Sequence, residues 1–310
     1  MLSNLQPLKV YASPIHTAAT PRAKQETAAS VSYLVEQLCA GSQVPEALSV
    51  LDLCTGTGCI PLLFANDLTR KTRNLNQLEV LGVDISATAV RLAQSNHERF
   101  REQANTNGLG FNTAPITRPP GVKADSQRDK QKITLQVQFV RGNILQAEST
   151  AKANVPSLTH VLQDVGRTRW DILISNPPYI SPAAFNKDTA RSVRNFEPKL
   201  ALVPPGLPNR SDEEQGDLFY PRLLAIADDV QARIVLVEVA DLAQAVRVAK
   251  FAGQTGSWDG IEVWRDDPSA TWTETIEGFK IRGSGNGRSV FLWRREAACW
   301  LPLNLTKWSR

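Results

Sequence analysis

Apolar runs with strand character alternate with amphipathic, helix-like segments from residue 47 onward. The expected strands are 48–53, 78–84, 133–140, 171–175, 234–239, 260–264 and 289–293. The expected helices are 60–68, a segment capped by Ser86 that runs to about Phe100, 218–230 and 242–251, with a weaker helix and connector in 146–169. This alternation predicts an α/β fold with a mostly parallel sheet and helices on both faces. Ligands bind such sheets at the carboxyl ends of the strands, near the point where the strand order reverses.

The fourth expected strand ends directly in Asn176-Pro177-Pro178-Tyr179. The Asn side chain offers both a donor and an acceptor, and so matches a planar amide or amidine edge. Each proline lacks a backbone donor and holds φ at about −65°, which leaves rigid carbonyls as acceptors. Tyr179 adds a flat face for stacking. The motif predicts a clamp for a planar –NH2 group, although a proline-rich loop that only ends a strand has the same composition.

A glycine-containing turn, Asp52-Leu53-Cys54-Thr55-Gly56-Thr57-Gly58, follows the first expected strand. Gly56 and Gly58 permit positive φ and a close approach of a ligand to the backbone. A dinucleotide fingerprint needs a third glycine at position 61, where this chain has Pro. A pyrophosphate cradle is therefore disfavoured, and Asp52 favours a cationic or amino-bearing ligand. The turn by itself is a weak signal.

Two further polar residues follow strands in the right order for a nucleoside. Asp84 closes the second strand, where a carboxylate can accept both ribose hydroxyls, and Asn143 follows the third, where an amide can bind an adenine edge. The combination describes a nucleoside with an amino-acid tail and no phosphate, S-adenosylmethionine. The expected cofactor contacts are Asp52, Cys54, Thr55, Gly56, Thr57, Gly58, Asp84, Asn143 and Asn176. The expected fold is the Rossmann-like class I SAM-dependent methyltransferase fold, with a mostly parallel seven-stranded sheet.

These residues resemble the HemK/PrmC family of release-factor glutamine N5-methyltransferases, in its eukaryotic, mitochondrial-type branch. Residues 50–60 and 174–180 carry the first part of the resemblance. Pro21-Arg22 with Glu26-Thr27 is similar to the family's Pro-Arg-Pro-x-Thr-Glu segment, and Asn195-Phe196-Glu197-Pro198 with Ala201-Leu202 to its Tyr-Glu-Pro-x-x-Ala-Leu segment. Gly216-Asp217-Leu218-Phe219-Tyr220 resembles the next stretch of the family. The resemblance implies that Glu197 and Arg22 bind the substrate.

The chain also departs from the family pattern. Cys54 stands where most members have Gly, and residues 23–27 lack the family's second Pro. Only about 20 residues precede the Pro21-Arg22 segment, so we expect the family's small N-terminal helical domain to be absent. The expected organisation is a leader (1–20), a segment bordering the active site (21–45), a methyltransferase domain (46–296) with insertions near 104–132 and 203–213, and a C-terminal tail (297–310).

Composition sets wider limits. The 310 residues carry a mild net charge of +4 with no concentrated basic block, so no stable nucleic-acid binding is expected. The four cysteines form no CxxC pair and the three histidines are scattered, which predicts free thiols and no metal. No apolar run reaches the length of a membrane span. Residues 1–25 contain Lys9, Arg22 and Lys24 and no acidic residue, a weak organelle-targeting composition that favours a mitochondrial over a cytoplasmic location.

The predicted reaction is methyl transfer from S-adenosylmethionine to the glutamine side chain of the Gly-Gly-Gln motif in a peptide chain release factor. Asn176 and the Pro177 carbonyl would accept the two N–H bonds of that amide, Tyr179 would pack on its plane, and Pro178 would keep the motif rigid. We expect no strong general base. Two alternatives remain open: a nucleic-acid amino methyltransferase acting on adenine N6 or guanine N2, and a non-catalytic cofactor-binding subunit.

Overall fold

Nine strands form one sheet in the part of the chain that the computed structural model describes, residues 21–43, 45–72, 74–106, 133–146 and 154–302. Their order is β3-β2-β1-β4-β5-β9-β6-β8-β7. The strands are β1 (Ala47–Leu53), β2 (Gln77–Asp84), β3 (Thr134–Arg141), β4 (Ile172–Ser175), β5 (Ile234–Glu238), β6 (Gly260–Asp267), β7 (Thr273–Ile276), β8 (Phe279–Arg282) and β9 (Ser284–Trp293). Strands β1 to β5 pair in parallel, whereas β9 lies antiparallel between β5 and β6.

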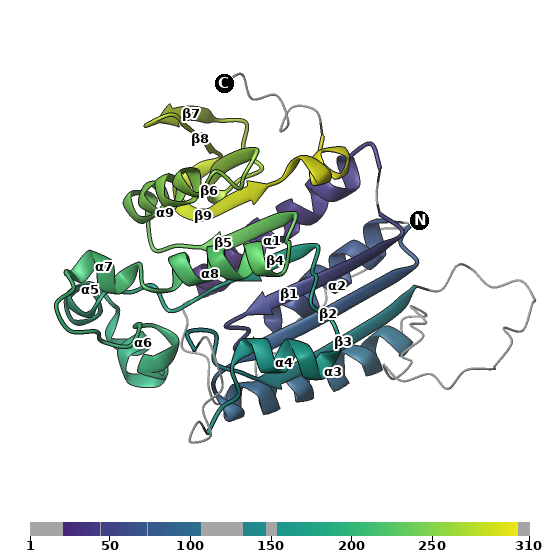
Figure 1. The fold of residues 1–310 in the computed structure, drawn as a ribbon, viewed down its shortest axis with the longest axis horizontal. Helices are drawn as coiled ribbons and strands as arrows, with labels where there is room; N and C mark the ends of the chain where they lie inside the picture. The colour runs from purple at the N-terminus through teal and green to yellow at the C-terminus, as the bar shows by residue number, and fades with distance from the viewer. Residues whose placement is uncertain (1–20, 44, 73, 107–132, 147–153, 303–310) are drawn as a thin grey trace, which may run out of the picture.

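Helices cover both faces of this sheet (Figure 1). One face carries α1 (Pro21–Ala40), α2 (Cys59–Lys71) and α3 (Ala87–Thr106), and the other carries α4 (Leu158–Val165), α8 (Phe219–Asp229) and α9 (Leu242–Thr255). The strands supply both cores by simple alternation: Leu51 and Leu53 belong to the core under α4, α8 and α9, whereas Leu48 and Val50 belong to the core under α1, α2 and α3.

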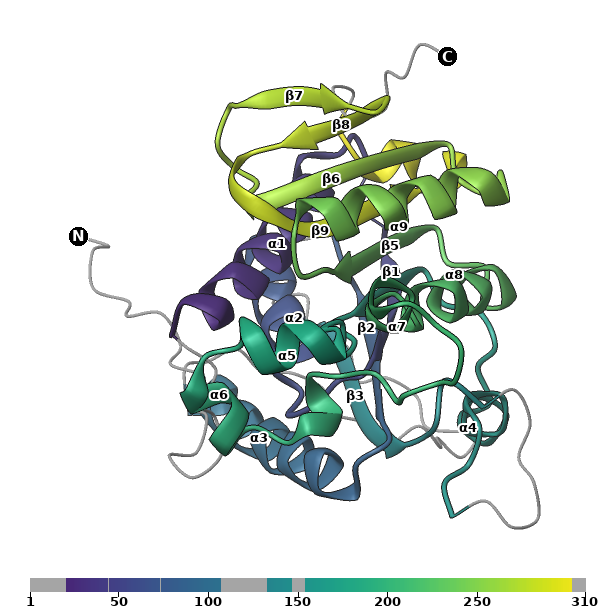
Figure 2. The ribbon, with the colours of Figure 1, turned by 90° about the vertical axis from the view of Figure 1, so that its left-hand side faces the viewer.

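Short helices crowd the edge of the sheet at which the parallel strands end (Figure 2). They are α5 (Pro182–Lys187), α6 (Arg191–Phe196), the 3₁₀ turn η1 (Lys199–Ala201) and α7 (Asp212–Gly216). The amino-terminal end of α1 lies at the same edge (Figure 2). The residues that follow β1, β2 and β4 therefore open toward these elements.

The strand order confirms the predicted Rossmann-like class I methyltransferase fold, with one difference in the count. From β1 the chain runs outward through β2 and β3, and it then returns to place β4 and β5 on the other side of β1. The order therefore reverses between β1 and β4, which is where such sheets bind ligands. The sheet has nine strands and not seven, because a hairpin of β7 and β8 extends it beyond β6.

Several local predictions were wrong or incomplete. The proline-rich composition of 180–212 predicts only a crossover after the fourth strand, but this segment contains three short helical elements before α7. The glycine-rich run 283–287 is expected from its composition to be a loop that joins the predicted strands 260–264 and 289–293. Most of it instead belongs to β9, which pairs with β6 through register shifts. Residues 104–106, assigned to an insertion, complete α3, and 107–132 lie outside the described residues. The tryptophans that cluster late in the sequence, Trp258, Trp264, Trp272 and Trp293, are expected from their size to pack in the core and on the sheet, but Trp272 is 64% exposed.

A buried charge cluster joins β6, β8 and α1. The Glu262 carboxylate accepts two hydrogen bonds from Arg282, at 2.9 and 3.1 Å, and one from the Trp264 indole at 3.1 Å. Lys280 makes a further ion pair with Glu262 at 3.2 Å. Tyr33 of α1 packs edge-on against Trp264, with ring centroids 4.9 Å apart. The cationic and indole partners make the burial of the Glu262 carboxylate tolerable. The ring contact between Tyr33 and Trp264 joins α1 to this part of the sheet.

The last residues that the structure describes also pack in the core. The turn η2 (Arg295–Trp300) and Leu301 contribute Ala297, Trp300 and Leu301 to the core under α1.

Cys39, Cys54, Cys59 and Cys299 are free thiols, as predicted. Within the described ranges, no helix combines the length and the apolar character that crossing a membrane requires.

Candidate active site

The glycine turn and the Asn-Pro-Pro-Tyr motif begin at neighbouring positions of the sheet. β1 and β4 pair so that Leu53 lies beside Ser175. The Ser175 hydroxyl donates a hydrogen bond to the Leu53 carbonyl at 2.7 Å, which ties the two strand ends together. The turn 54–58 and the motif 176–179 therefore leave the sheet side by side, at the point where the strand order reverses.

The turn is shaped by backbone contacts and by its glycines. The Thr55 amide donates to the Val83 carbonyl at 3.1 Å, and the Gly58 amide donates to the Thr55 carbonyl at 2.9 Å. Gly56 has φ of 56° and faces open space, since a Cβ atom there would meet nothing within 4 Å. Gly58 has φ of 74°, and a Cβ atom there would lie only 2.7 Å from the Phe139 ring. The turn thus offers backbone groups to a ligand on an open side.

Cys54 carries a conformational cost that a glycine would avoid. Its φ is 60°, in the left-handed region that side chains with a Cβ disfavour. The residue is partly exposed, yet burial around the sulfur raises the pKa of the thiol well above its usual range, and the charges of Asp84 and Asp52 raise it further. The thiol is therefore a neutral, inert neighbour of the turn at physiological pH.

Asp52 is a buried carboxyl group without a hydrogen-bonding partner. The residue is fully buried, and within the described part of the chain neither side-chain oxygen accepts a hydrogen bond. Burial raises its pKa from 3.8 to about 8; the nearby Thr55 hydroxyl opposes this rise without reaching hydrogen-bond geometry, because its oxygen is also unpaired. A buried acid left in this way fits a cationic or amino-bearing ligand, which would supply the missing partner.

Asp84 and Asn143 lie at the ends of the next two strands, as predicted. One Asp84 oxygen accepts the Gly56 amide at 2.8 Å and the other accepts the Ser86 amide at 2.8 Å, so the carboxylate joins β2, the glycine turn and α3. Burial raises the pKa of Asp84, and the two backbone donors oppose that rise. The Asn143 side-chain oxygen accepts the Leu145 amide at 3.0 Å, which fixes the side chain in the turn after β3.

The Asn-Pro-Pro-Tyr motif has two buried prolines between two partly exposed residues, Asn176 and Tyr179. The Tyr179 hydroxyl donates to Glu238 Oε1 at 3.0 Å. Glu238 Oε2 accepts a second hydrogen bond, at 2.5 Å, from the Thr27 hydroxyl of α1. Burial and the charge of Glu238 raise the pKa of Tyr179 well above its usual range, so the phenol stays protonated and continues to donate, although part of the residue remains accessible.

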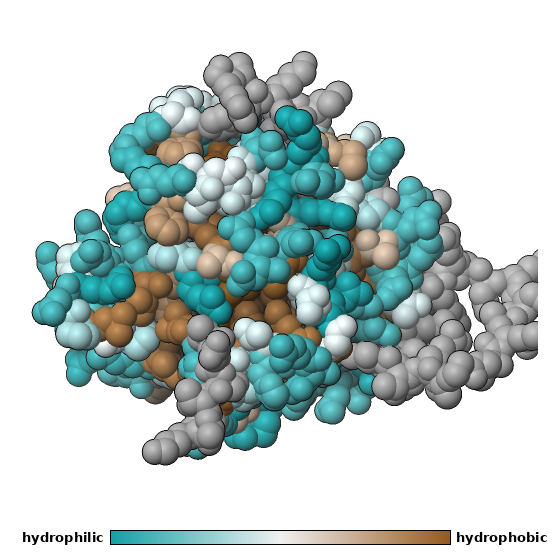
Figure 3. All heavy atoms as spheres, in the orientation of Figure 1, coloured by the Kyte–Doolittle hydropathy of each residue, from teal (hydrophilic) through white to brown (hydrophobic). Residues whose placement is uncertain are grey.

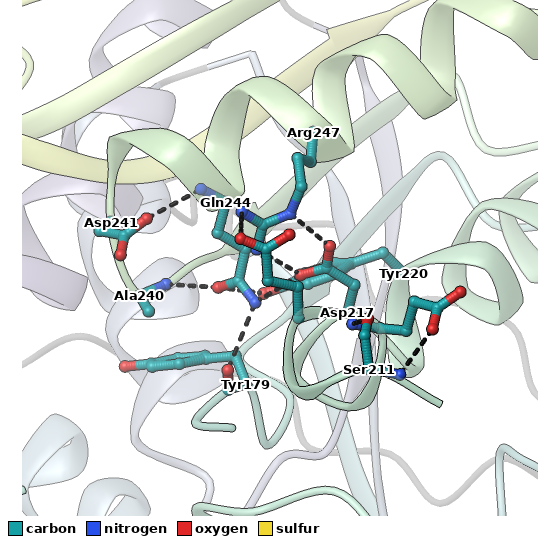
Figure 4. Close-up of polar contacts among 10 residues, drawn as sticks. Tyr179, Ser211, Asp217, Tyr220, Ala240, Asp241, Gln244 and Arg247 are labelled. Atoms are coloured by element: carbon teal, nitrogen blue, oxygen red, sulfur yellow. Dashed lines mark hydrogen bonds and ion pairs between the residues drawn. The ribbon is translucent and has the colours of Figure 1, made fainter. Parts of the chain in front are cut away.

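A second set of polar residues holds the backbone after the motif (Figure 4). Gln244 Nε2 donates to the Tyr179 carbonyl at 3.3 Å and to Asp217 Oδ1 at 2.8 Å, while Gln244 Oε1 accepts the Ala240 amide at 2.8 Å. Asp217 in turn accepts two hydrogen bonds from Arg247, at 2.7 and 3.0 Å. Sequence reasoning missed Gln244 and Arg247, because helix periodicity gives no sign that a helix residue reaches a loop 65 positions away.

Two residues that the family resemblance placed at the substrate lie on elements around this edge. Glu197 caps the carboxyl end of α6, and the stretch that follows is joined to the motif because the Ile180 amide donates to the Leu202 carbonyl at 2.9 Å. Arg22 lies in α1, but its side chain falls outside the described residues. Figure 3 shows apolar side chains exposed near the end of the molecule where α5, α6 and α7 lie. In this stretch Phe196 is 67% exposed and Leu200 is 53% exposed.

Comparison with known proteins adds a sequence relationship to this geometry. Over 156 residues, the chain is 28% identical to the mitochondrial MRF1 N(5)-glutamine methyltransferase of Saccharomyces cerevisiae, a match that covers 50% of this chain and 33% of that protein. It is 45% identical over 223 residues to the release factor glutamine methyltransferase of Haemophilus influenzae, covering 72% of this chain and 56% of that protein. The chain is related to the release factor glutamine methyltransferases.

The matches cover only part of each relative. The release factor glutamine methyltransferase of Chlorobaculum tepidum is 28% identical over 183 residues, covering 59% of this chain and 45% of that protein. The chain thus spans between a third and about half of the length of the first curated relatives it matches. No protein-family profile matches it. Among solved structures, a human methyltransferase 10 domain containing protein is similar at a TM-score of 0.42 and 13% identity, covering 87% of this chain and 82% of that one. At such a score the fold assignment rests on the strand order.

Proposed function

We propose that this protein transfers a methyl group from S-adenosylmethionine to the side-chain nitrogen of the glutamine in the Gly-Gly-Gln motif of a peptide chain release factor. The observation that carries the proposal is the position of the Asn-Pro-Pro-Tyr motif. It leaves β4 beside a turn with an open glycine and an unpartnered buried carboxyl group. The names of the sequence relatives support the choice of substrate.

The residues around the glycine turn fit the cofactor. Asp52 offers an acceptor for positive charge, the backbone at Gly56 is open to close approach, and Asp84 has carboxylate oxygens that can accept further hydrogen bonds besides those from two amides. Cys54, Thr55, Thr57 and Gly58 complete the turn, and Asn143 would lie toward the base. When bound, the cofactor supplies an electrophilic methyl group on a sulfonium centre.

The motif itself is suited to orienting a primary amide. Asn176 is partly exposed, and its side-chain oxygen and the Pro177 carbonyl can each accept one N–H of the substrate glutamine. This arrangement directs the nitrogen and stabilises the positive charge that grows on it during methylation. Tyr179 offers its ring as a flat wall for the amide plane. The nitrogen releases a proton to water after the new N–C bond has formed, so no buried base is required.

The surroundings of the site support a protein as the substrate. The stretch from α5 to η1 lies directly after the motif and exposes Phe196 and Leu200. An exposed apolar surface beside an active site is typical of protein recognition. We propose a release factor as this partner, with Glu197 and Arg22 on the elements that would face it. The mitochondrial relatives in two yeasts favour a mitochondrial location, although bacterial relatives match equally well.

The test is a transfer assay with radiolabelled S-adenosylmethionine. Purified protein is offered a release factor, the same factor with the Gly-Gly-Gln glutamine replaced by alanine, and separately tRNA, rRNA and DNA. Label on the intact factor alone is the expected result. Label on a nucleic acid would establish the alternative, an amino methyltransferase acting on a base.

Asn176→Ala is expected to abolish transfer because it removes one of the two acceptors, while the affinity for the cofactor changes only a few-fold. The matched control is Asn74→Ala, which removes the same functional group from an exposed position before β2, at the edge of the sheet opposite the site, and should leave transfer unchanged. Unchanged turnover in Asn176→Ala would remove the clamp from the mechanism.

A further inference from the structure

Tyr179 is held at its two opposite ends. Its hydroxyl donates to Glu238 at 3.0 Å, and its backbone carbonyl accepts from Gln244 at 3.3 Å. Glu238 is only 6% exposed and Gln244 only 3%, so neither contact competes with bulk water. If the Tyr179 carbonyl had no donor, a substrate amide could bind to it in the wrong position. Gln244 donates to this carbonyl and so prevents that contact.

Both partners of Tyr179 come from one short stretch of chain. Glu238 ends β5 and Gln244 lies in the first turn of α9, where the Asp241 side chain caps the helix by accepting the Gln244 amide at 2.8 Å. The central strand β5 and the helix cap therefore set the distance between the two anchors. A strand in the middle of a sheet is a rigid support for residues that must hold another side chain in place.

Neighbouring groups leave Gln244 a single useful orientation. Its Nε2 faces two acceptors, the Tyr179 carbonyl and Asp217 (Figure 4). Its Oε1 accepts the Ala240 amide at 2.8 Å and lies 3.3 Å from the Tyr220 hydroxyl, which makes its shorter hydrogen bond, at 2.9 Å, to the Glu238 carbonyl. Arg247 holds Asp217 in place through its paired hydrogen bonds. The backbone of Gly216 also packs there, since a Cβ atom on it would lie 3.2 Å from the Tyr179 carbonyl oxygen.

We infer that Glu238 and Gln244 are positioning residues that fix Tyr179 and, through it, the acceptor carbonyl of Pro177. Only Pro178 lies between Pro177 and Tyr179, and its ring restricts φ. A change in the orientation of Tyr179 therefore also changes the orientation of the Pro177 peptide plane. The inference rests on the proposed function for the identity of the amide that this carbonyl accepts. Displacement of such an acceptor by about 1 Å lowers a rate by roughly 100-fold.

Glu238 also connects Tyr179 to α1. Its second oxygen accepts the Thr27 hydroxyl, so one carboxylate holds the catalytic motif and the amino-terminal helix together. Two substitutions at Glu238 differ in whether an acceptor for the Tyr179 hydroxyl remains. Glu238→Gln keeps an oxygen that accepts from Tyr179, whereas Glu238→Leu has a similar size and keeps no acceptor.

The first experiment measures steady-state methylation of a release factor. Gln244→Met and Glu238→Leu should each lower kcat by about 10- to 100-fold while KM for the factor and the cofactor Kd stay within about 3-fold. Glu238→Gln should retain kcat within about 3-fold. In a Tyr179→Phe background, Glu238→Leu should lower kcat by a smaller factor than it does in the unaltered protein, because its contact with the Tyr179 hydroxyl is already lost.

Gln215→Met is the matched control. Gln215 is also buried and also binds backbone groups, since it donates to the Leu207 carbonyl and accepts the Leu207 amide, but neither contact involves Tyr179. Its kcat should match that of the unaltered protein at a temperature where all variants are folded. A kcat in Gln244→Met equal to that of Gln215→Met would overturn the inference.

A second readout does not depend on the substrate. Hydrogen exchange of the peptide that spans 176–181 should accelerate by at least about 10-fold in Gln244→Met, because the Ile180 amide is held by Leu202 only while the motif stays in place. Exchange there should be unchanged in Gln215→Met. If the unaltered protein methylates no release factor, the proposed function fails, and the exchange measurement still decides whether Gln244 holds the motif. Unchanged exchange in Gln244→Met would refute that role.

Discussion

Asp52→Asn is expected to stabilise the protein without cofactor, by an amount that grows with pH. The unaltered carboxyl group is fully buried and has no hydrogen-bonding partner within the described residues. Burial raises its pKa from 3.8 to about 8, so the folded protein holds a proton that the unfolded chain releases near pH 4. Below pH 4 both states carry the proton, so the pH-dependent part of the cost of burying Asp52 vanishes.

The size of the effect follows from this difference in pKa. Between pH 4 and pH 8 the folded state binds one proton more than the unfolded state, so the free energy of unfolding falls by about 1.4 kcal/mol per pH unit on account of this group. A rise from 3.8 to about 8 amounts to at most about 6 kcal/mol at pH 8 and above. Asn has the same shape and does not ionise. The variant should therefore gain up to about 4 kcal/mol on the unaltered protein between pH 4 and pH 7.

Urea unfolding at pH 4, 5, 6, 7 and 8, followed by tryptophan fluorescence, measures this difference. Asp229→Asn, which removes one exposed carboxylate from α8, serves as the control. A constant difference for Asp52→Asn would refute the reasoning, because it would mean that Asp52 is already ionised in the folded protein. Calorimetry with S-adenosylmethionine at pH 8 should show at least about 10-fold weaker binding by Asp52→Asn, because the ligand loses a charged acceptor.

Three other substitutions test local features of the fold by urea unfolding. Cys54→Gly should be about 1 kcal/mol more stable than Cys54→Ala, because only glycine adopts φ of 60° without strain; equal stabilities would show that the turn is unstrained. Gly58→Ala should lose roughly 1 to 3 kcal/mol more than Gly166→Ala, since both have φ of 74° but only the former places a Cβ atom against Phe139. Glu262→Leu should lose about 3 to 5 kcal/mol, because it leaves buried cationic partners without their carboxylate, and a loss below about 1 kcal/mol would contradict that account.

The sequence predicted the central sheet well because its signal is local. Buried parallel strands are short apolar runs, and β1, β2, β4 and β5 each begin and end within about one residue of the expected range. The motif residues also carry their own meaning, since glycines with positive φ and an Asn-Pro-Pro-Tyr strand end restrict the backbone locally. The predicted capping role of Ser86 is confirmed, because its hydroxyl accepts the Ala89 amide at 3.3 Å.

Predictions failed where pairing in space decides the structure. The strand β9 includes Gly285 and Gly287, which no strand propensity favours, because its pairing with β6 across a bulge supplies the stabilisation. Likewise, α1 has no acidic residue in its first turn and no basic residue in its last turn, and the sequence analysis expects no 20-residue helix there. Its packing against the sheet, through Tyr33 and its apolar face, stabilises it.

The sequence by itself therefore determined the succession of strands and helices along the chain. It also indicated the carboxyl ends of the strands as the place for a ligand and named the residues proposed to bind a cofactor and an amide. Only the tertiary structure showed that Tyr179 is held between Glu238 and Gln244, and that Asp52 is buried with no hydrogen-bonding partner among the described residues. The physical reason is that apolar periodicity and backbone restrictions act over a few neighbouring residues. Hydrogen-bonding partners and desolvation depend instead on which distant segments the fold brings together.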